Sequence, residues 1–188
     1  MMGAALSGAG GVPVAGSAPP PTLSVGFGWT PPPDPRADFD LDASALMLDD
    51  AGVVLSEDHF VHFNNPRSPD GAVEHRGPVP DGRGETIDVD LAAVPDRCAR
   101  IAFAVSVFDA ANRGQSLGQV GTVSVRLSRR PDGAAPVRHD VAVRPDDPAT
   151  AVLLGELTRR DDWAFHAVGR GYPGGLREIV LEHGLAAR

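Results

Sequence analysis

The chain of 188 residues has no lysine, one cysteine and few aromatic side chains, which make up 5% of its composition. The single Cys98 excludes an internal disulfide. Because it lies in the apolar segment 97–108, we expect it to pack in the core as a small hydrophobic residue. All 17 basic residues are arginines, which we interpret as genome composition rather than function.

No run of about 18 apolar residues occurs in the sequence, so we expect no transmembrane segment. Residues 1–16 lack the charged region of a signal peptide, and glycines interrupt their apolar residues. The sequence therefore predicts a cytoplasmic protein.

The net charge of −8 is unevenly distributed along the chain. Residues 1–94 carry 14 acidic residues and 4 arginines, a balance of −10, whereas residues 95–188 carry 11 acidic residues and 13 arginines, a balance of +2. An acidic first half disfavours binding to nucleic acid and suits binding to a cation.

Glycine and proline are abundant, at 22 and 18 residues, and they separate short apolar segments. This pattern predicts an all-β fold, a sandwich of two antiparallel sheets with eight to ten strands and a short C-terminal helix over 174–185. The length and the 42% hydrophobic content suit a single domain over 1–188, of which about 1–22 are expected to be loosely ordered. The strands are expected within 12–16, 22–29, 39–48, 59–65, 86–94, 99–110, 121–143 and 149–172.

Three aspartates, Asp38, Asp40 and Asp42, alternate with apolar residues at the start of the strand predicted over 39–48. In an extended chain such residues line one face, so their carboxylates stand roughly 7 Å apart. The spacing also matches ligands of an EF-hand loop, but Ala43 occupies the position where that loop needs glycine. Because adjacent like charges repel, two interpretations stay open: a solvated strand face, or a site for a hard cation such as calcium.

Further oxygen atoms follow in the next part of the chain. Calcium takes about 6–8 oxygen ligands and accepts irregular geometry, whereas zinc is not expected, because His59 and His62 point to opposite faces of an alternating strand. The additional candidate ligands are Asn64, Asn65, Ser68, Asp70 and Glu85.

Two patterns with enzymatic associations are weak. The segment 169–174 matches a dinucleotide-binding glycine pattern, but the 14 residues of 175–188 are too few for the second strand and acidic residue of such a fold. Serine, histidine and aspartate residues occur without a nucleophile elbow or another ordered signature. We therefore do not expect an enzyme.

Several stretches follow one another over almost the whole chain: VGFGW, DFDLDASALMLDDAG, FVHFNN, SPDGAVEHRG, IDVDL, IAFAVSVFDA, GQSLGQV and GELTRRDDWAFHAVGRGYPGGL. In these stretches and in their order the chain resembles the TerD family, the tellurium-resistance and stress-response proteins of bacteria. The resemblance implies a β-sandwich with long calcium-binding loops at one end and a non-enzymatic, calcium-binding role in the stress response. It also implies work alongside other stress-response proteins in a membrane-associated complex.

The resemblance assigns calcium ligands to this chain, and the chain also departs from the family pattern. Thr30 follows Gly-Trp where the family has aspartate, and Pro78 and Val79 stand where the family has Asp-Asn. The acidic run that follows is shortened to DGRGE. With oxygen atoms missing, we expect a reduced number of calcium sites. The residues that the resemblance implies as ligands are Asp38, Asp40, Asp42, Asn64, Asn65 and Asp70, to which Glu85 is added as a candidate from the residues alone.

Two functions are therefore compatible with the sequence. The first is a calcium-binding stress-response protein without catalysis. The alternative is a divergent interaction or adaptor domain that keeps the sandwich and binds calcium weakly or not at all.

Overall fold

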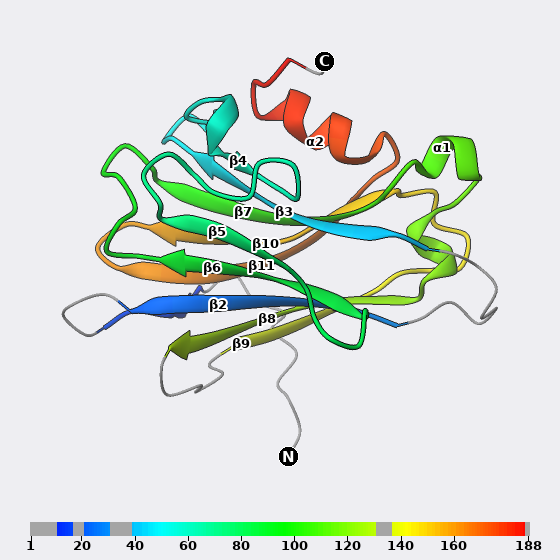
Figure 1. The fold of residues 1–188 in the computed structure, drawn as a ribbon, viewed down its shortest axis with the longest axis horizontal. Helices are drawn as coiled ribbons and strands as arrows, with labels where there is room; N and C mark the ends of the chain where they lie inside the picture. Colours follow the sequence, from blue (N-terminus) through cyan, green and yellow to red (C-terminus); the bar gives the residue numbers. More distant parts are fainter. Residues whose placement is uncertain (1–10, 17–20, 31–38, 131–136, 187–188) are drawn as a thin grey trace.

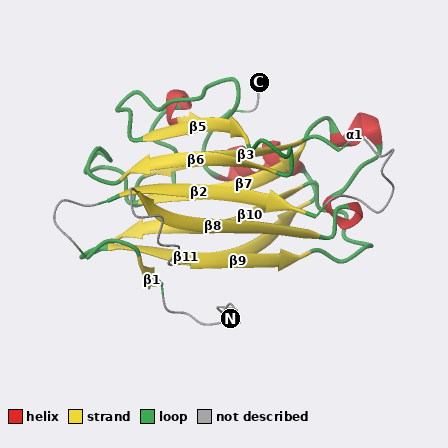
Figure 2. Ribbon diagram, turned by 60° about the horizontal axis from the view of Figure 1, so that its bottom comes forward, coloured by secondary structure: helices red, strands yellow, loops and turns green. Residues whose placement is uncertain are grey.

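The structure is a computed structural model, which describes residues 11–16, 21–30, 39–130 and 137–186. These residues form two antiparallel sheets packed face to face (Figures 1 and 2). The strands are β1 (Val12–Pro13), β2 (Thr22–Trp29), β3 (Leu41–Leu48), β4 (Phe60–Val61), β5 (Val73–Pro78), β6 (Gly84–Asp90), β7 (Arg100–Val107), β8 (Thr122–Arg130), β9 (Val137–Ala142), β10 (Ala151–Arg159) and β11 (Trp163–Tyr172). The helices are the 3₁₀ turns η1 (Glu57–His59) and η2 (Leu117–Gln119), and α1 (Ala110–Arg113) and α2 (Gly175–Glu182).

The sheets differ in size and in strand order. Sheet A has the order β1-β11-β10-β7-β3-β4, and sheet B has the order β5-β6-β2-β8-β9. Strand β3 contacts β6, and β4 contacts β5, so the β3–β4 edge of sheet A faces the β6–β5 edge of sheet B.

Apolar residues on the inner faces of both sheets form the main core. On β2 the inward residues Leu23, Val25 and Phe27 are buried, while the residues between them are partly exposed. The rings of Phe27 and Phe103 of β7 lie 6.0 Å apart, so aromatic contacts join the two sheets. This alternation is what a strand with one buried and one solvated face requires.

Helix α2 covers part of the outer face of sheet A (Figure 1). Its residues Ile179 and Val180 pack in a second apolar cluster with Leu46, Ala104 and Tyr172 of the sheet. Burial of this cluster fixes the helix on the sheet, because an amphipathic helix this short is stabilised mainly by packing.

The predicted fold class, a sandwich of two antiparallel sheets with a short C-terminal helix, is confirmed. The described residues form eleven strands, more than the eight to ten predicted, because β5 (Val73–Pro78) lies in a segment rich in turn residues where no strand was expected. The calcium-binding role of the loops stays a prediction. Strand β2 spans the predicted residues, and β8 and β9 pair as the predicted hairpin, whose turn at 131–136 lies outside the described residues. Helix α2 falls inside the predicted range 174–185. Within the residues that the structure describes, no helix is long and apolar enough to cross a membrane.

The N-terminal segment that we expected to be loosely ordered is described only in part. Residues 11–16 contain β1, whose Val12 and Pro13 pair with β11. Residues 1–10 and 17–20 lie outside the described part of the chain.

The strand predicted over 59–65 is confirmed at Phe60 and Val61 and is wrong at the other residues. Only Phe60 and Val61 pair with β3, and the next four residues form a turn closed by backbone hydrogen bonds between His62 and Asn65. The side-chain amide of Asn65 donates to the carbonyl oxygen of Phe60. This local bond favours the turn over a longer strand.

Candidate functional site

The candidate site lies where the start of β3 meets sheet B. Strand β4 pairs only with Ala45 and Leu46, so the backbone N–H of Ala43 lies on the edge of β3 beyond the end of β4. Oε2 of Glu85, on β6, accepts a hydrogen bond from this N–H at 2.6 Å. A carboxylate of sheet B thus takes a place on the edge of sheet A that a longer β4 would fill.

His75 holds the same carboxylate from β5. Its Nε2 lies 3.1 Å from Oε2 of Glu85, and both side chains are largely buried. The Nδ1 atom of His75 accepts a hydrogen bond from the backbone N–H of Gly77. The proton is therefore on Nε2, which donates to Glu85, and Glu85 is fixed from two sides.

Asp42 lies near Glu85 in a partly buried position. Burial is the main cause that raises the pKa of Asp42 to about 6. The negative charges of Asp40 and Glu85 raise it further, and His75 lowers it. The ionised form of Asp42 is therefore disfavoured first by burial and then by the neighbouring carboxylates. A nearby cation would offset the repulsion from those carboxylates.

The described side chains fit calcium in their chemistry but supply only part of a coordination shell. Asp40, Asp42 and Glu85 offer oxygen atoms, as calcium prefers. Among the described residues, no group of three or more histidine, cysteine, aspartate or glutamate side chains is arranged to hold a metal ion. Asp38, the first residue of the predicted aspartate row, lies outside the described residues.

Asp70 does not join these carboxylates. The backbone N–H of Asp90, at the far end of β6, donates to the carbonyl of Ala72. Asp70 therefore lies near the opposite end of β6 from Glu85, and five strand residues correspond to roughly 16 Å. The residues predicted as one site are divided between two ends of the sandwich.

Asp70 instead forms a chain of hydrogen bonds with residues on either side of β4. Its Oδ2 lies 3.2 Å from Nε2 of the buried His59, whose Nδ1 lies 2.6 Å from the hydroxyl of Ser56. Its Oδ1 accepts hydrogen bonds from the hydroxyl of Ser68 and the N–H of Ala72. We interpret this network as structural, because it ties the loop before β5 to η1.

The chain of hydrogen bonds from Ser56 through His59 to Asp70 and the pairing of His75 with Glu85 were not predicted from the sequence. The spacing of Ser56 and His59 at the start of a helical turn is a signal for the first. The pairing of His75 with Glu85 has a weaker signal in the sequence. Both are polar residues at inward positions of neighbouring strands, but these positions can be recognised only when the strand register is known.

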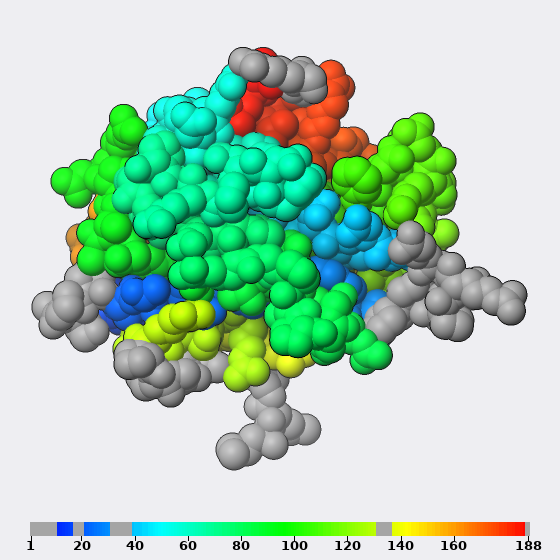
Figure 3. Space-filling view, viewed as in Figure 1, coloured from blue at the N-terminus to red at the C-terminus, as the bar shows by residue number. Residues whose placement is uncertain are grey.

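Asn64 and Asn65 lie on a different surface. They line a groove of about 680 Å³ between the turn after β4 and helix α2, whose apolar side includes Phe60 and Val180. Figure 3 shows the segment after β4 at the centre of one face, next to α2. Within the described residues, neither asparagine side chain hydrogen-bonds to the carboxylate of Glu85.

The sequence of this chain is similar to those of known proteins. Residues 2–183 match the family model of the TerD domain. The chain is 38% identical, over an alignment of 192 residues, to the tellurium resistance protein TerD of Serratia marcescens, covering 99% of this chain and 100% of that protein. It is also 38% identical over 167 residues to general stress protein 16U of Bacillus subtilis, covering 86% of each.

A solved structure shares the fold. It is a homologue of the telluride resistance protein TerD from Streptomyces coelicolor, with a TM-score of 0.66 and 23% identity over 89% of this chain and 99% of that chain. At this identity the likeness supports the sandwich architecture alone.

Proposed function

This chain belongs to the TerD domain family, and from that premise we propose that it is a non-enzymatic stress-response protein of the tellurium-resistance type that binds calcium at the start of β3. The relatives described above are named for tellurium resistance and general stress, and neither name denotes an enzyme. The observation that carries the calcium proposal is the crowding of Asp42 by Asp40 and Glu85, which contributes to its raised pKa of about 6.

Each carboxylate has a distinct role in this proposal. Calcium supplies the positive charge that offsets the acidic cluster. Glu85 is already held by Ala43 and His75, so its ordering costs little on binding. Asp42 would hold the ion in its ionised form, and the exposed Asp40 would turn toward the ion. Asp38 completes the aspartate row that the family resemblance implies.

The adaptor alternative is supported by two observations. Within the described part of the chain, no group of histidine, cysteine and acidic side chains is arranged to hold a metal. Pro78, which stands where the family has an acidic residue, pairs directly with Glu85 in the β5–β6 ladder. A domain that lost this oxygen would retain the sandwich and bind calcium weakly.

Calorimetric titration of the full chain with calcium, after treatment with a chelator, tests the proposal. We expect saturable binding, and we expect Asp40→Asn and Asp42→Asn each to weaken it by about 5–10-fold, since each removes a charged ligand. Asp146→Asn is the matched control, because Asp146 is an exposed aspartate that pairs with the exposed Arg144.

Thermal melting gives an independent measurement. Because a ligand that binds only the folded state stabilises it by RT ln(1 + [L]/Kd), calcium at ~100 Kd should add about 2.7 kcal/mol. Absence of both heat and a melting shift at millimolar calcium would overturn the calcium proposal and favour the adaptor.

We further propose that the protein works in the cytoplasm with other stress-response proteins, in a complex that associates with membranes. Support comes from the family membership and from large apolar side chains on the surface, including Phe63 and Phe108, which are 48% and 47% exposed. Co-purification of the chain with a co-expressed family member, with calcium and with chelator, tests the first part. Co-sedimentation of that complex with lipid vesicles tests the second.

A further inference from the structure

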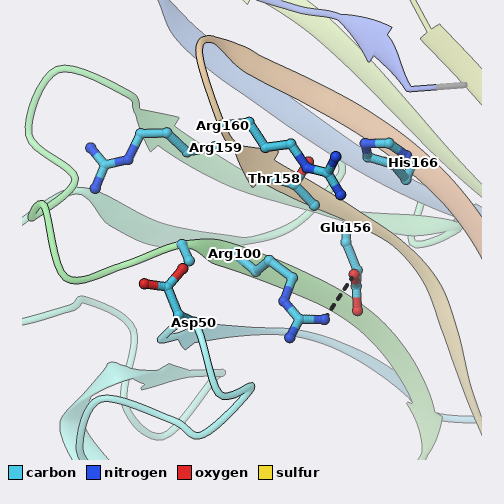
Figure 4. A pocket seen from close by; sticks show the side chains of 8 residues that line it. Asp50, Arg100, Glu156, Thr158, Arg159, Arg160 and His166 are labelled. Carbon is cyan, nitrogen blue, oxygen red and sulfur yellow. Dashed lines mark ion pairs between the residues drawn. The ribbon is translucent and has the colours of Figure 1, made fainter.

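A polar pocket, drawn in Figure 4, lies on the outer face of sheet A. Its volume of about 430 Å³ is within the range of small-molecule sites. Arg100, which lines the pocket, pairs with the last residue of β3, whereas Asp42 lies at the start of that strand. The pocket and the acidic site therefore occupy opposite ends of β3.

A β-bulge in β10 directs side chains into this pocket. The register shifts at Gly155 against both neighbouring strands. Before the bulge Leu154 points into the core, and after it Leu157 does, so Glu156 and Thr158 face outward and line the pocket. Bulges re-aim side chains in this way and are frequent next to functional sites.

The guanidinium groups of Arg160 and Arg100 offer hydrogen-bond donors to the pocket. Arg160 extends toward His166 and Thr158 (Figure 4), and no ion-pair partner for Arg160 is found among residues that the structure describes. Arg100 makes a long ion pair with Glu156, at 3.7 Å. Both cations therefore retain donors for a ligand.

Arg159 also borders the pocket but is committed to the fold. Its side chain points away from Arg160 in Figure 4 and donates to the carbonyl oxygens of Pro95 and Cys98. Its guanidinium also lies 5.2 Å from the ring centre of the buried Trp163. We therefore assign it no role in binding.

We propose that this pocket binds a small oxyanion, held by Arg160 and Arg100, with Thr158 and His166 as additional hydrogen-bond donors. Guanidinium groups present paired N–H donors that match oxyanions. The net charge of the chain is −8, so general attraction does not bring anions to its surface. Binding depends on this local arrangement.

Glu156 determines which oxyanion is accepted. Its side chain is 16% exposed and pairs with Arg100 inside the pocket. A carboxylate accepts hydrogen bonds and donates none, so it repels a fully ionised anion such as sulfate and accepts a hydrogen bond from an anion that keeps a proton. Hydrogen phosphate and hydrogen tellurite both have this chemistry, and the exposed Asp50 adds another acceptor at the rim.

Calorimetric titration of the full chain with phosphate, tellurite and sulfate tests the inference, with a chelator present and at constant ionic strength. We expect phosphate, tellurite or both to bind, and sulfate to bind at least about 10-fold more weakly. Arg160→Gln should weaken binding by about 10-fold, since it removes a charge-assisted hydrogen bond. Arg126→Gln is the matched control, because Arg126 is an exposed strand arginine of sheet B.

Glu156→Gln provides the sharper readout. Glutamine can donate an N–H to sulfate, so this variant should lose the discrimination between sulfate and phosphate. Thr158→Val, which is nearly isosteric, should also weaken anion binding. It serves as the test variant if thermal melting shows that Arg160→Gln is unstable.

Each result of the anion titrations has a distinct interpretation. Binding of phosphate alone identifies a phosphate or phosphate ester as the ligand, and binding of tellurite alone links the pocket to tellurium resistance. The inference is overturned if none of the three anions binds at millimolar concentration, if Arg126→Gln loses as much affinity as Arg160→Gln, or if sulfate binds the parent as well as phosphate does. Because a chelator is present throughout, failure of the calcium proposal does not affect this result.

Discussion

The carboxylate oxygen Oε2 of Glu85 lies 2.6 Å from the backbone nitrogen of Ala43. A glutamate of sheet B therefore closes the open edge of β3 in sheet A, and His75 donates to the same oxygen. The residue that joins the two sheets at this edge also lies close enough to Asp42 to raise its pKa. Packing of the sandwich and the charge of the proposed calcium site are thus coupled through one side chain.

Glu85→Leu should destabilise the protein by about 2–4 kcal/mol, because it leaves the N–H of Ala43 and the Nε2 proton of His75 without their partner. Glu85→Gln should cost less, since the amide oxygen can still accept one of these bonds. Urea unfolding measures both. Glu74→Gln, on the solvated face of β5, serves as a control with an expected change within about 0.5 kcal/mol. Equal stabilities for Glu85→Leu and the parent would show that the bond is not maintained in solution.

The metal-free protein should lose stability as the pH rises from about 4 to about 7 through the titration of Asp42. The folded-state pKa of Asp42, about 6, lies above its ordinary value of 3.8. Its contribution is therefore fully present below pH 3.8 and is lost as the pH rises through 6. Because the side chain is only partly buried, we expect an effect on the order of 1–2 kcal/mol.

The measurement for this prediction is the difference in unfolding free energy between the parent and Asp42→Asn, taken with a chelator at several pH values. The difference should move in favour of Asp42→Asn as the pH rises, since asparagine does not ionise. A constant difference between pH 4 and pH 7.5 would mean that Asp42 ionises as freely as in the unfolded chain.

The sequence predicts the sandwich well, because alternating apolar residues on strands such as β2 and β7 report directly which face is buried. It predicts the proximity of Asp40 and Asp42, which are two residues apart. It does not place Asp70 correctly relative to them, because the direction in which β5 and β6 run over β3 depends on tertiary packing. The turn at 62–65 was missed because an asparagine side chain, and not hydrophobic periodicity, determines it.

Asp70→Asn should lower stability by about 1–2 kcal/mol and leave calcium affinity unchanged. The carboxylate accepts hydrogen bonds from Ser68 and Ala72 and contacts the buried His59. Asp70 lies near the end of β6 opposite Glu85, so its carboxylate should not contribute to calcium binding. Asp90→Asn is the matched control, since the carboxylate of Asp90 accepts a turn hydrogen bond from the N–H of Ala92 at the end of β6 away from Glu85.

This prediction separates two roles for Asp70. Calorimetry with calcium and urea unfolding are performed on the same samples. A loss of calcium affinity comparable with that of Asp42→Asn would return Asp70 to the ligand set that the family resemblance implies.

Pro78→Asp should raise calcium affinity and lower metal-free stability at the same time. Pro78 pairs directly with Glu85 in the β5–β6 ladder, and directly opposed residues project on the same face with Cβ atoms about 5 Å apart. An aspartate there places a fourth carboxylate beside Asp40, Asp42 and Glu85. The added charge increases repulsion in the absence of metal and adds a ligand when calcium is bound, with a gain of about 5–10-fold in affinity.

Pro78→Asn, whose side chain has the shape of aspartate without the charge, controls for the altered backbone freedom. Thermal melts of the parent and both variants, each with calcium and with chelator, decide the matter. A calcium-induced shift that is equal in all three proteins would mean that the missing carboxylate at this position does not limit calcium binding.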